Sequence, residues 1–476
     1  MTEQTPAPVV ELSVGAVAHG GHFVSRHEGR VVFVRHALPG ERVRVRLTEY
    51  DDDARFWRGD AVEVLEASPD RREHVWAPAD ALAAHGAGRL PAGGAEFGHI
   101  TLPRQRELKS DVVVEHLSRA AGVDAAAVGF AGVEAAPGED PDGLGWRTRM
   151  AFAVSAAGRP AMHAHRSDRL VEISGMPLAA AGIQDSRLWG TDLTGFGRVE
   201  VAAPAVGGQL LVLLVPAEGT APATAQRAAR RVAQDLGPEV SVALLSQADG
   251  PAADGRGGLQ RISGRTWLRE TVDVDAPGAP YEYRVTGEGF WQIHRCAPAL
   301  LTSAVLDIVD ARPGHRVADL YAGAGLFTRA LAELVGPTGT VLSIEGAPGT
   351  SRDARRNLHG HAQARIVQGR VERRLRPELA DVSGARAGTG VRAPGRGGAL
   401  DAVVLDPPRA GAGKEAVRQI AAAAPGTVAY VSCDPASFAR DTAYLAREGY
   451  RLEGLRAFDL YPNTHHVELV GRFAAR

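Results

Sequence analysis

The stretch Val428-Ala-Tyr-Val-Ser-Cys433-Asp434-Pro435 joins an apolar run to a cysteine and then to the start of a helix. A short continuous apolar run is typical of a strand that is buried on both faces of a parallel sheet. In open α/β folds, chemistry takes place at the carboxyl ends of such strands. The pattern therefore places the thiol of Cys433 at the mouth of a sheet, where a nucleophile belongs.

Strands and helices alternate around this stretch through residues 283–476. We expect strands at Arg316–Tyr321, Thr340–Glu345, Ala402–Asp406 and Val428–Cys433, and helices at Phe327–Val335, Thr350–His359 and Lys414–Ala424. This repeat predicts a parallel, doubly wound α/β sheet. Between Gly384 and Gly398, a tract of Gly, Ala and Arg lacks apolar residues to pack, so we expect a mobile surface insertion there.

The first two thirds of the chain divide into two further parts. In residues 9–67, short strands separated by Gly and Pro turns predict a small β-barrel of the oligonucleotide-binding (OB) type. Residues 68–282 combine a helical pattern at Leu102–Gly122 with strands and a second helix at Ala223–Leu236, which predicts a central α+β domain. We therefore expect three domains, at 9–67, 68–282 and 283–476.

Composition excludes several classes of protein. Two cysteines, Cys296 and Cys433, cannot build a disulfide scaffold or an all-cysteine metal site, and we expect no metal. Residues 1–8 lack a secretory pattern and no apolar run reaches about 18 residues. These features predict a cytoplasmic protein without a membrane segment, and we expect a monomer.

The segment after the first strand of the C-terminal domain has the features of a cofactor site. Gly323 and Gly325 allow a tight turn before a helix, and Glu345 ends the next strand, where a carboxylate can accept ribose hydroxyls. A dinucleotide site would favour a third glycine where this chain has Thr328. S-adenosylmethionine carries no pyrophosphate, so the pattern favours this methyl donor over NAD. Asp406, followed by two prolines, ends the next strand in a rigid loop.

With these residues assembled, the chain resembles the S-adenosylmethionine-dependent RNA uracil-C5 methyltransferases, which make 5-methyluridine in tRNA and 23S ribosomal RNA. The resemblance covers nearly the whole length. Its motifs are Phe33-Val34 and Leu38-Pro39-Gly40-Glu41 in a TRAM-like barrel, Gly93-Gly94-Ala95-Glu96-Phe97-Gly98-His99 through Gln105 and Lys109, Trp146-Arg147-Thr148-Arg149, and Phe290-Trp291-Gln292-Ile293-His294. It implies a Rossmann-like class I methyltransferase domain at the C-terminus.

The resemblance also implies roles for particular residues. Cys433 matches the family's nucleophile and Glu468 its general base, while the cofactor contacts match Gln292, Tyr321, Glu345 and Asp406. Many members hold a [4Fe–4S] cluster through four cysteines. Here the matching positions are Ala92, Ala95 and Met176, and segment 68–91 has no cysteine for the fourth, so we expect no cluster.

The implied chemistry explains why these groups are needed. C5 of uracil becomes nucleophilic only after a thiolate adds to C6, and a base must afterwards remove the C5 proton. We expect Arg409 or the helix beginning at Pro435 to help ionise Cys433. The RNA partner would be tRNA or 23S rRNA, with Arg26, Arg30, Arg35, Arg44 and Arg46 as possible phosphate contacts.

Two alternatives stay open at this point. The chain could be a non-catalytic RNA-binding protein built on a decayed enzyme, although the intact set of Cys433, Glu468, Asp406 and Glu345 argues against decay. It could also methylate C5 of cytosine in RNA, but such enzymes generally use a pair of cysteines, and Cys296 lies in no motif resembling theirs.

Overall fold

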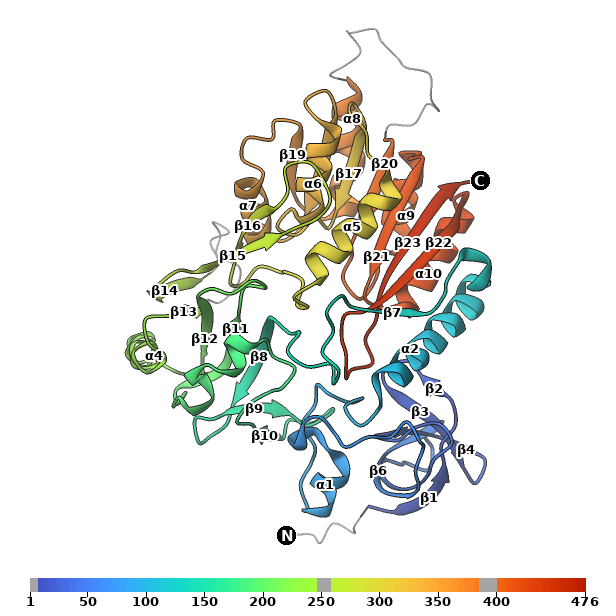
Figure 1. Ribbon diagram of the computed structural model, residues 1–476, viewed down its shortest axis with the longest axis vertical. Helices are drawn as coiled ribbons and strands as arrows, with labels where there is room; N and C mark the ends of the chain where they lie inside the picture. The colour runs from blue at the N-terminus through green and yellow to red at the C-terminus, as the bar shows by residue number, and fades with distance from the viewer. Residues whose placement is uncertain (1–6, 246–257, 385–399) are drawn as a thin grey trace.

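The computed structural model describes residues 7–245, 258–384 and 400–476. Figure 1 shows a β-barrel at the N-terminal end, a second sheet from the middle of the chain beside it, and a large sheet with helices on both faces at the C-terminal end. Residues 385–398 of the Gly/Ala/Arg tract lie outside the described residues. Among the residues described, no helix combines the length and apolarity needed to cross a bilayer.

The N-terminal barrel is a six-stranded sheet in the order β1-β5-β6-β4-β3-β2. Its strands are β1 Val9–Ser13, β2 Val17–Ala18, β3 His22–His27, β4 Arg30–Arg35, β5 Arg42–Glu49 and β6 Phe56–Glu66. Polar and apolar residues alternate in β5, and Val43, Val45 and Leu47 are fully buried. The alternation produces one core inside the barrel, as expected for residues 9–67.

The middle of the chain forms a seven-stranded sheet in the order β10-β9-β8-β11-β12-β13-β14. The strands are β8 Arg149–Val154, β9 Pro160–His163, β10 Leu170–Glu172, β11 Phe196–Ala202, β12 Leu210–Pro216, β13 Val240–Leu245 and β14 Leu259–Ser263. Helix α4 (Pro222–Leu236) packs Ala225, Ala229 and Val232 into the core of this sheet. Short elements near it are η1 Ala77–Ala79, α3 Ala181–Gln184, η4 Arg187–Gly190 and the hairpin β15 Trp267–Val272 with β16 Tyr281–Thr286. Helix α1 (Ala81–Gly86) contacts β6 of the barrel, and η3 (Ala126–Val128) contacts β22 of the C-terminal sheet.

The C-terminal sheet has eight strands in the order β19-β18-β17-β20-β21-β23-β22-β7. They are β7 Val133–Ala135, β17 Arg316–Leu320, β18 Thr340–Glu345, β19 Ala364–Gln368, β20 Ala402–Leu405, β21 Thr427–Ser432, β22 Tyr450–Asp459 and β23 Glu468–Ala475. One face is covered by α5 (Ala297–Val309) and α6 (Leu326–Val335), and the other by α8 (Val371–Gly384), α9 (Gly413–Ala422) and α10 (Pro435–Arg447). Helix α7 (Pro348–Asn357) follows β18. The doubly wound α/β domain is thus confirmed.

The last strands depart from the expected parallel sheet. β23 lies between β21 and β22 and runs antiparallel to both. β22 and β23 are joined by residues 460–467 only, and so short a connection cannot make the crossover that a parallel pair needs. β7 at the far edge lies more than 300 residues before β22 in the chain, and it pairs parallel to β22.

Helix α2 (Leu102–His116) connects the barrel to the C-terminal sheet. It contacts β2 of the barrel as well as α10 and β7 of the C-terminal domain. Helical structure continues to Ala121 as a wider π turn and stops at Gly122, whose φ of 64° is the left-handed conformation common at helix ends. On the inner face of α2, Lys109 donates to Asp459 Oδ1 at 2.6 Å, and both side chains are almost completely buried.

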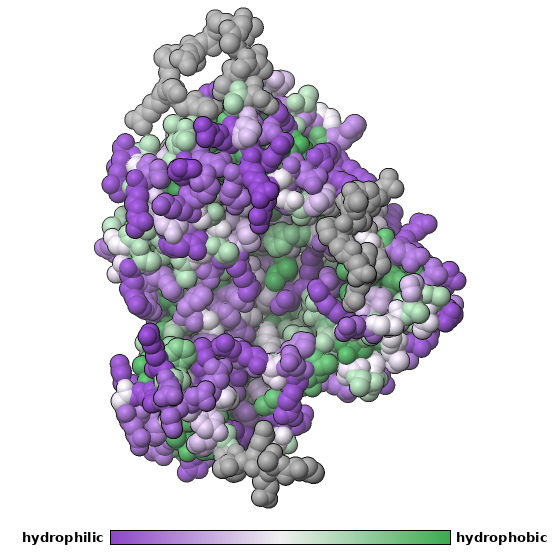
Figure 2. Space-filling view, turned by 180° about the vertical axis from the view of Figure 1, so that it is seen from behind, coloured by the Kyte–Doolittle hydropathy of each residue, from purple (hydrophilic) through white to green (hydrophobic). Residues whose placement is uncertain are grey.

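The surface is mostly hydrophilic, as the space-filling view of Figure 2 shows. Apolar residues gather there in a recess at mid-height. A cavity of about 360 Å³ lies between the central sheet and residues 287–293.

We predict that the buried pair of Lys109 and Asp459 stabilises the junction between α2 and β22. Lys109→Met should lower the free energy of unfolding by about 3–5 kcal/mol, because Asp459 would remain buried without a cation. The double variant Lys109→Met/Asp459→Leu should recover most of that loss. Denaturant titration measures both effects.

Arg119→Met is the matched control, since Arg119 pairs with Glu115 on an exposed surface and should cost less than about 1 kcal/mol. Equal losses in the Lys109 single variant and the double variant would show that the ion pair is not the cause.

Candidate active site

Cys433 directly follows β21 and Glu468 begins β23, and these two strands are neighbours in the sheet. In the β21–β23 ladder, Ser432 pairs with Leu469, so the next rung places Cys433 opposite Glu468. Directly opposed residues of antiparallel strands have their α-carbons about 4.5–5.5 Å apart. The register alone therefore brings together the two residues for which the sequence predicted catalytic roles, although 34 positions separate them in the chain.

Glu468 lies in a buried environment with one strong polar contact. Its side chain is 2% exposed, and Oε2 accepts a hydrogen bond of 2.8 Å from the hydroxyl of Tyr461. Burial raises the pKa of Glu468 above its ordinary value, and the nearby carboxylate of Asp406 adds a smaller effect in the same direction. A carboxylate with a raised pKa is a stronger base once ionised, which suits a group that must take a proton from carbon.

The thiol of Cys433 is not ionised in the protein alone. Burial raises its pKa to about 12, and the negative charges of Glu468 and Asp406 add to the effect. Arg409 lowers it, as the sequence suggested, but is outweighed. Asp434, which caps α10 by accepting from Ser437 N at 2.7 Å, adds a further negative charge that raises the pKa of Cys433.

The residues expected at a cofactor lie along the carboxyl edge of the same sheet. Glu345 accepts from the backbone N–H of Gly323 at 2.9 Å and from that of Ala347 at 2.6 Å. Gly323 and Gly325 have φ angles of 57° and 90°, where L side chains are strained, so the turn requires glycine. Glu345 thereby fixes the loop between β17 and α6 against the end of β18.

Asp406 ends β20 one strand away from Cys433. Gln292 donates to its Oδ2 at 3.1 Å; Gln292 is buried and Asp406 is partly buried. Burial and the charge of Asp319 raise the pKa of Asp406. Tyr321 adopts a left-handed φ of 60° where β17 enters the glycine turn.

The edge carries buried negative charge that suits a cationic ligand. Asp319 is completely buried, and its pKa is raised to about 7 by burial. Thr328 donates to its Oδ2, so this residue serves the packing of α6 on β17 and not a pyrophosphate. Among the described residues, Asp319 Oδ1 has no hydrogen-bond partner. A sulfonium or ammonium group beside Asp319 and Asp406 would favour the ionised form of both carboxyl groups.

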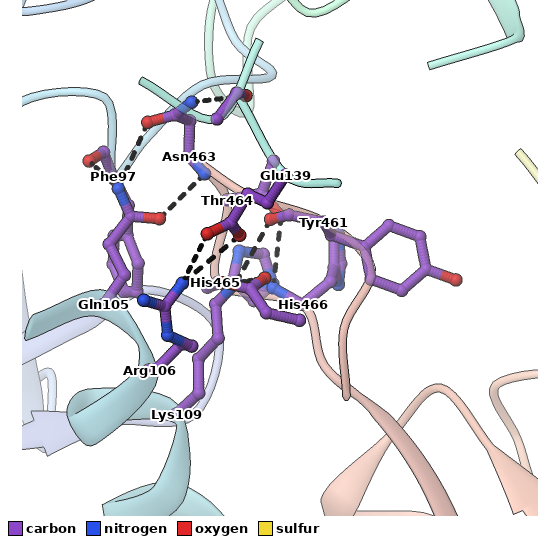
Figure 3. Close-up of polar contacts among 12 residues, drawn as sticks. Phe97, Gln105, Arg106, Lys109, Glu139, Tyr461, Asn463, Thr464, His465 and His466 are labelled. Carbon is purple, nitrogen blue, oxygen red and sulfur yellow. Dashed lines mark hydrogen bonds and ion pairs between the residues drawn. The ribbon is translucent and has the colours of Figure 1, made fainter. Parts of the chain in front are cut away.

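The loop between β22 and β23 is fastened by residues that the sequence did not single out for this purpose. Asn463, with a φ of 65°, accepts from Gln105 and Arg72 through its side-chain oxygen and donates to the carbonyls of Asp142 and Gly143. Its backbone N–H donates to Gln105 Oε1 at 2.7 Å (Figure 3). One asparagine thus joins the catalytic loop to α2 and to residues 142–143.

Lys109 and Glu96 hold the two ends of the same loop. Lys109 donates to the backbone carbonyl of Tyr461 at 3.1 Å (Figure 3). The hydroxyl of the same Tyr461 donates to Glu468. Glu96 accepts from the backbone N–H of His465 and contacts its ring, while His466 lies 3.3 Å from Arg409. The sequence indicated Gln105 and Lys109 only as parts of a motif. These residues bind partners about 350 or more positions away in the chain, and such contacts leave no local signal in the sequence.

The barrel forms one wall of the active-site cavity. A cavity of about 90 Å³ beside Cys433 is lined by residues 17–21 of the barrel, by residues 433–435 and 465–467, and by Arg409. His19 contacts Asp434 at 2.9 Å across this boundary. Of the barrel arginines named as phosphate contacts, Arg35 binds buried Asp60 through two hydrogen bonds and Arg44 pairs with Glu63, so neither is freely available.

The positions that match the cluster cysteines lie together in the structure. Ala92, Ala95 and Met176 are all buried and belong to one apolar core. Cys296 lies elsewhere, at the start of α5, with its sulfur 3.4 Å from the carbonyl of Pro137. Neither cysteine of the chain lies at the matching positions, and apolar side chains occupy them.

Comparison with known proteins identifies similar sequences over the whole chain. The family model described as tRNA (Uracil-5-)-methyltransferase matches residues 254–474, and the TRAM domain model matches residues 4–62. A protein of Streptomyces avermitilis described as an uncharacterized RNA methyltransferase is 40% identical over 465 residues, which is 97% of this chain and 96% of that one. The 23S rRNA (uracil(1939)-C(5))-methyltransferase RlmD of Alkalilimnicola ehrlichii is 30% identical, with coverage of 98% and 97%.

A solved structure shares the overall fold. The crystal structure of the Pyrococcus abyssi tRNA (uracil-54, C5)-methyltransferase in complex with S-adenosyl-L-homocysteine superposes with a TM-score of 0.65 at 20% sequence identity. The match covers 97% of this chain and 99% of that one. The barrel, the central sheet and the C-terminal α/β domain therefore recur together in another protein.

We predict that Cys433 reacts slowly with alkylating reagents in the protein alone. Because its pKa is raised to about 12, the thiolate fraction, and with it the rate of reaction with iodoacetamide, should still rise about tenfold per pH unit at pH 9.5. Mass spectrometry of a Cys296→Ser variant follows this residue alone. A rate that levels off between pH 8 and 9, as for an ordinary cysteine, would contradict the prediction.

Proposed function

Because the chain belongs to the family of S-adenosylmethionine-dependent RNA uracil-C5 methyltransferases, we propose that it transfers a methyl group to C5 of a uridine in tRNA or 23S rRNA through a covalent adduct between Cys433 and C6. The observation that carries the proposal is the opposition of Cys433 and Glu468 on adjacent strands, one strand from Asp406. The proposed nucleophile Cys433 and the proposed base Glu468 thus lie beside Asp406, at the edge of the sheet that would bind the cofactor.

S-adenosylmethionine supplies the methyl group on a cationic sulfonium. Gln292 and Asp406 would hold its amino acid end, and Glu345 its ribose, with Tyr321 and the glycine turn at Gly323 and Gly325 beside it. This arrangement has an electrostatic consequence for the nucleophile. A cation near Asp406 offsets one of the charges that raise the pKa of Cys433, so the thiol ionises more readily in the loaded enzyme than alone.

The first step makes C5 nucleophilic. The thiolate of Cys433 forms a bond to C6, and the electrons of the C5–C6 double bond move into an enolate at C4. C5 then accepts the methyl group, and the bond between the methyl carbon and the sulfonium sulfur breaks. The methylated base remains attached to Cys433 with one proton still on C5.

Glu468 carries out the second step. Its carboxylate removes the C5 proton, the C5–C6 double bond returns, and the bond between sulfur and C6 breaks. Tyr461 holds the carboxylate through its hydroxyl and is itself fixed through its carbonyl by Lys109. The orientation of the base is therefore set by the loop network described above.

We predict that the enzyme converts uridine to 5-methyluridine and that Glu468→Gln stops the reaction after methyl transfer. Glutamine keeps the size of the side chain but cannot accept the proton, so a covalent protein–RNA adduct carrying labelled methyl should accumulate. Denaturing electrophoresis with radiolabelled S-adenosylmethionine detects it. The substrates are tRNA and 23S rRNA transcripts, with uracil-only and cytosine-only oligonucleotides to compare the bases.

Cys433→Ala is the control, because it removes the attacking sulfur without touching the cofactor edge. This variant should bind S-adenosylmethionine nearly normally, transfer no methyl group, and abolish the adduct when combined with Glu468→Gln. Free turnover by Glu468→Gln, an adduct without Cys433, or methylation of cytosine alone would each overturn the assignment.

A further inference from the structure

Two histidines and a glutamate converge at the end of the loop between β22 and β23. His465 and His466 are consecutive in this loop, and their ring centroids lie 4.0 Å apart (Figure 3). Glu96 reaches them from the segment before α2, 369 positions before His465 in the chain. One ligand atom from each of the three residues lies within 4.8 Å of those of the other two. Among the described residues, no other set of three His, Cys, Asp or Glu side chains converges in this way.

The carboxylate of Glu96 has an oxygen that the protein does not use. Its Oε1 makes both contacts with His465, accepting from the backbone N–H at 3.1 Å and touching ring atom Nδ1. Among the described residues, Oε2 has no hydrogen-bond partner, and no lysine or arginine pairs with Glu96. The ammonium group of Lys109 is bound to Asp459 at 2.6 Å instead. A largely buried carboxylate with only imidazole as its partner is suited to binding a cation.

His466 presents a ring nitrogen that carries a lone pair. Its Nε2 lies 3.3 Å from Nη2 of Arg409. Because a guanidinium group only donates hydrogen bonds, Nε2 must be the acceptor in this contact. The contact is long for a hydrogen bond, and among the described residues Arg409 makes no other hydrogen bond or ion pair. Arg409 is therefore free to turn aside, and the lone pair of His466 is then available to a metal ion.

Gly21 of the barrel encloses the group from another side. A Cβ at Gly21 would lie 3.1 Å from Cβ of His465, 3.2 Å from its Nδ1 and 3.3 Å from Cγ of Glu96. A side chain there would crowd both residues, and the φ of 78° also favours glycine. On the opposite side, His465 and His466 line the cavity of about 90 Å³ beside Cys433. The group thus has protein against one side and space for water molecules on the other.

We propose that Glu96, His465 and His466 bind one Zn²⁺ ion. Two imidazoles and one carboxylate are a common set of protein ligands for zinc, and a water molecule from the cavity would complete the tetrahedron. Mg²⁺ and Ca²⁺ prefer oxygen ligands, so the two histidines select against them. The expectation of no metal came from the number of cysteines, which does not bear on a site made of histidine and glutamate.

The ion would fasten the loop that leads into β23. Only Val467 separates His466 from the proposed base Glu468, whereas Glu96 belongs to the first quarter of the chain. The ion would therefore add a third attachment to those made by Gln105 and Lys109. Ligands so far apart in the chain come together only when it folds, so Zn²⁺ should raise the temperature of thermal unfolding.

Calorimetric titration of the untagged, chelator-treated protein with Zn²⁺ tests the site, in the absence of RNA and S-adenosylmethionine. The wild type should bind one ion per chain. Glu96→Gln, His465→Gln and His466→Gln should each raise the Kd at least about tenfold, because even the loss of a residue that only supports a metal ligand has an effect of that size. Mg²⁺ should not bind at the concentrations at which Zn²⁺ saturates the site.

His361→Gln is the matched control, because His361 lies 2.9 Å from Glu333 in a histidine–glutamate pair that has no third ligand among the described residues. It should leave the Kd for Zn²⁺ unchanged. Cys433→Ala should do the same, although it removes a thiol from the adjoining cavity. Loss of binding in Cys433→Ala would assign the ion to the thiol and overturn the proposal. Unchanged affinity in the three ligand variants, equal binding of Mg²⁺, or no binding by the wild type would also overturn it.

X-ray absorption spectroscopy of the zinc-loaded wild type identifies the ligands without any substitution, so the test does not depend on how well the variants fold. It should find nitrogen and oxygen ligands at about 2.0–2.1 Å, and sulfur at about 2.3 Å would contradict the proposal. Neither measurement involves methyl transfer. The zinc site therefore stands or fails independently of the proposed function.

Discussion

The antiparallel pairing of β23 with β21 is the constraint on which the active site depends. A slip of one residue in this register would turn every side chain of β23 to the opposite face and carry Glu468 away from Cys433. The chain prevents such a slip by fixing the loop before β23 from outside the sheet. Asn463, the carbonyl of Tyr461 and the backbone N–H of His465 are bound by Gln105, Lys109 and Glu96 respectively. Residues from the first quarter of the chain thus position the loop that leads into Glu468 near its end.

The electrostatics of the site follow from burying carboxylates close together. Asp319 and Glu468 are buried and Asp406 is partly buried, and removal from solvent raises the pKa of each. Such an edge is costly in the empty protein but is well matched to a cationic cofactor. It also keeps Cys433 protonated until that charge is balanced, which couples the reactivity of the thiol to the loading of the cofactor edge.

The local patterns of the sequence predicted the C-terminal domain well. Continuous apolar runs gave strands such as Thr340–Glu345 with the bounds observed, because a strand buried on both faces leaves no other interpretation for such a run. They also placed Cys433 at a strand end. The antiparallel β23 was not predicted, since strand direction depends on the connection and not on composition.

Long-range contacts left the least trace in the sequence. Nothing local in α2 announces that Lys109 meets Asp459. The expectation that barrel arginines stand free for phosphates failed for Arg35, because its partner Asp60 comes from the neighbouring strand of the barrel. Resemblance to a family supplied the pairing of Cys433 with Glu468, which spacing alone could not.

The central claim is that Cys433 bonds to the substrate base and that a proton must leave C5 before it can be released. An RNA containing 5-fluorouridine tests this directly, because fluorine cannot leave C5 as a cation and the adduct cannot break down. Mass spectrometry of the digested complex should find the peptide containing Cys433 joined to a methylated 5-fluorouridine, in equimolar yield and only with S-adenosylmethionine present. Complete turnover without an adduct, or attachment at Cys296, would contradict the account.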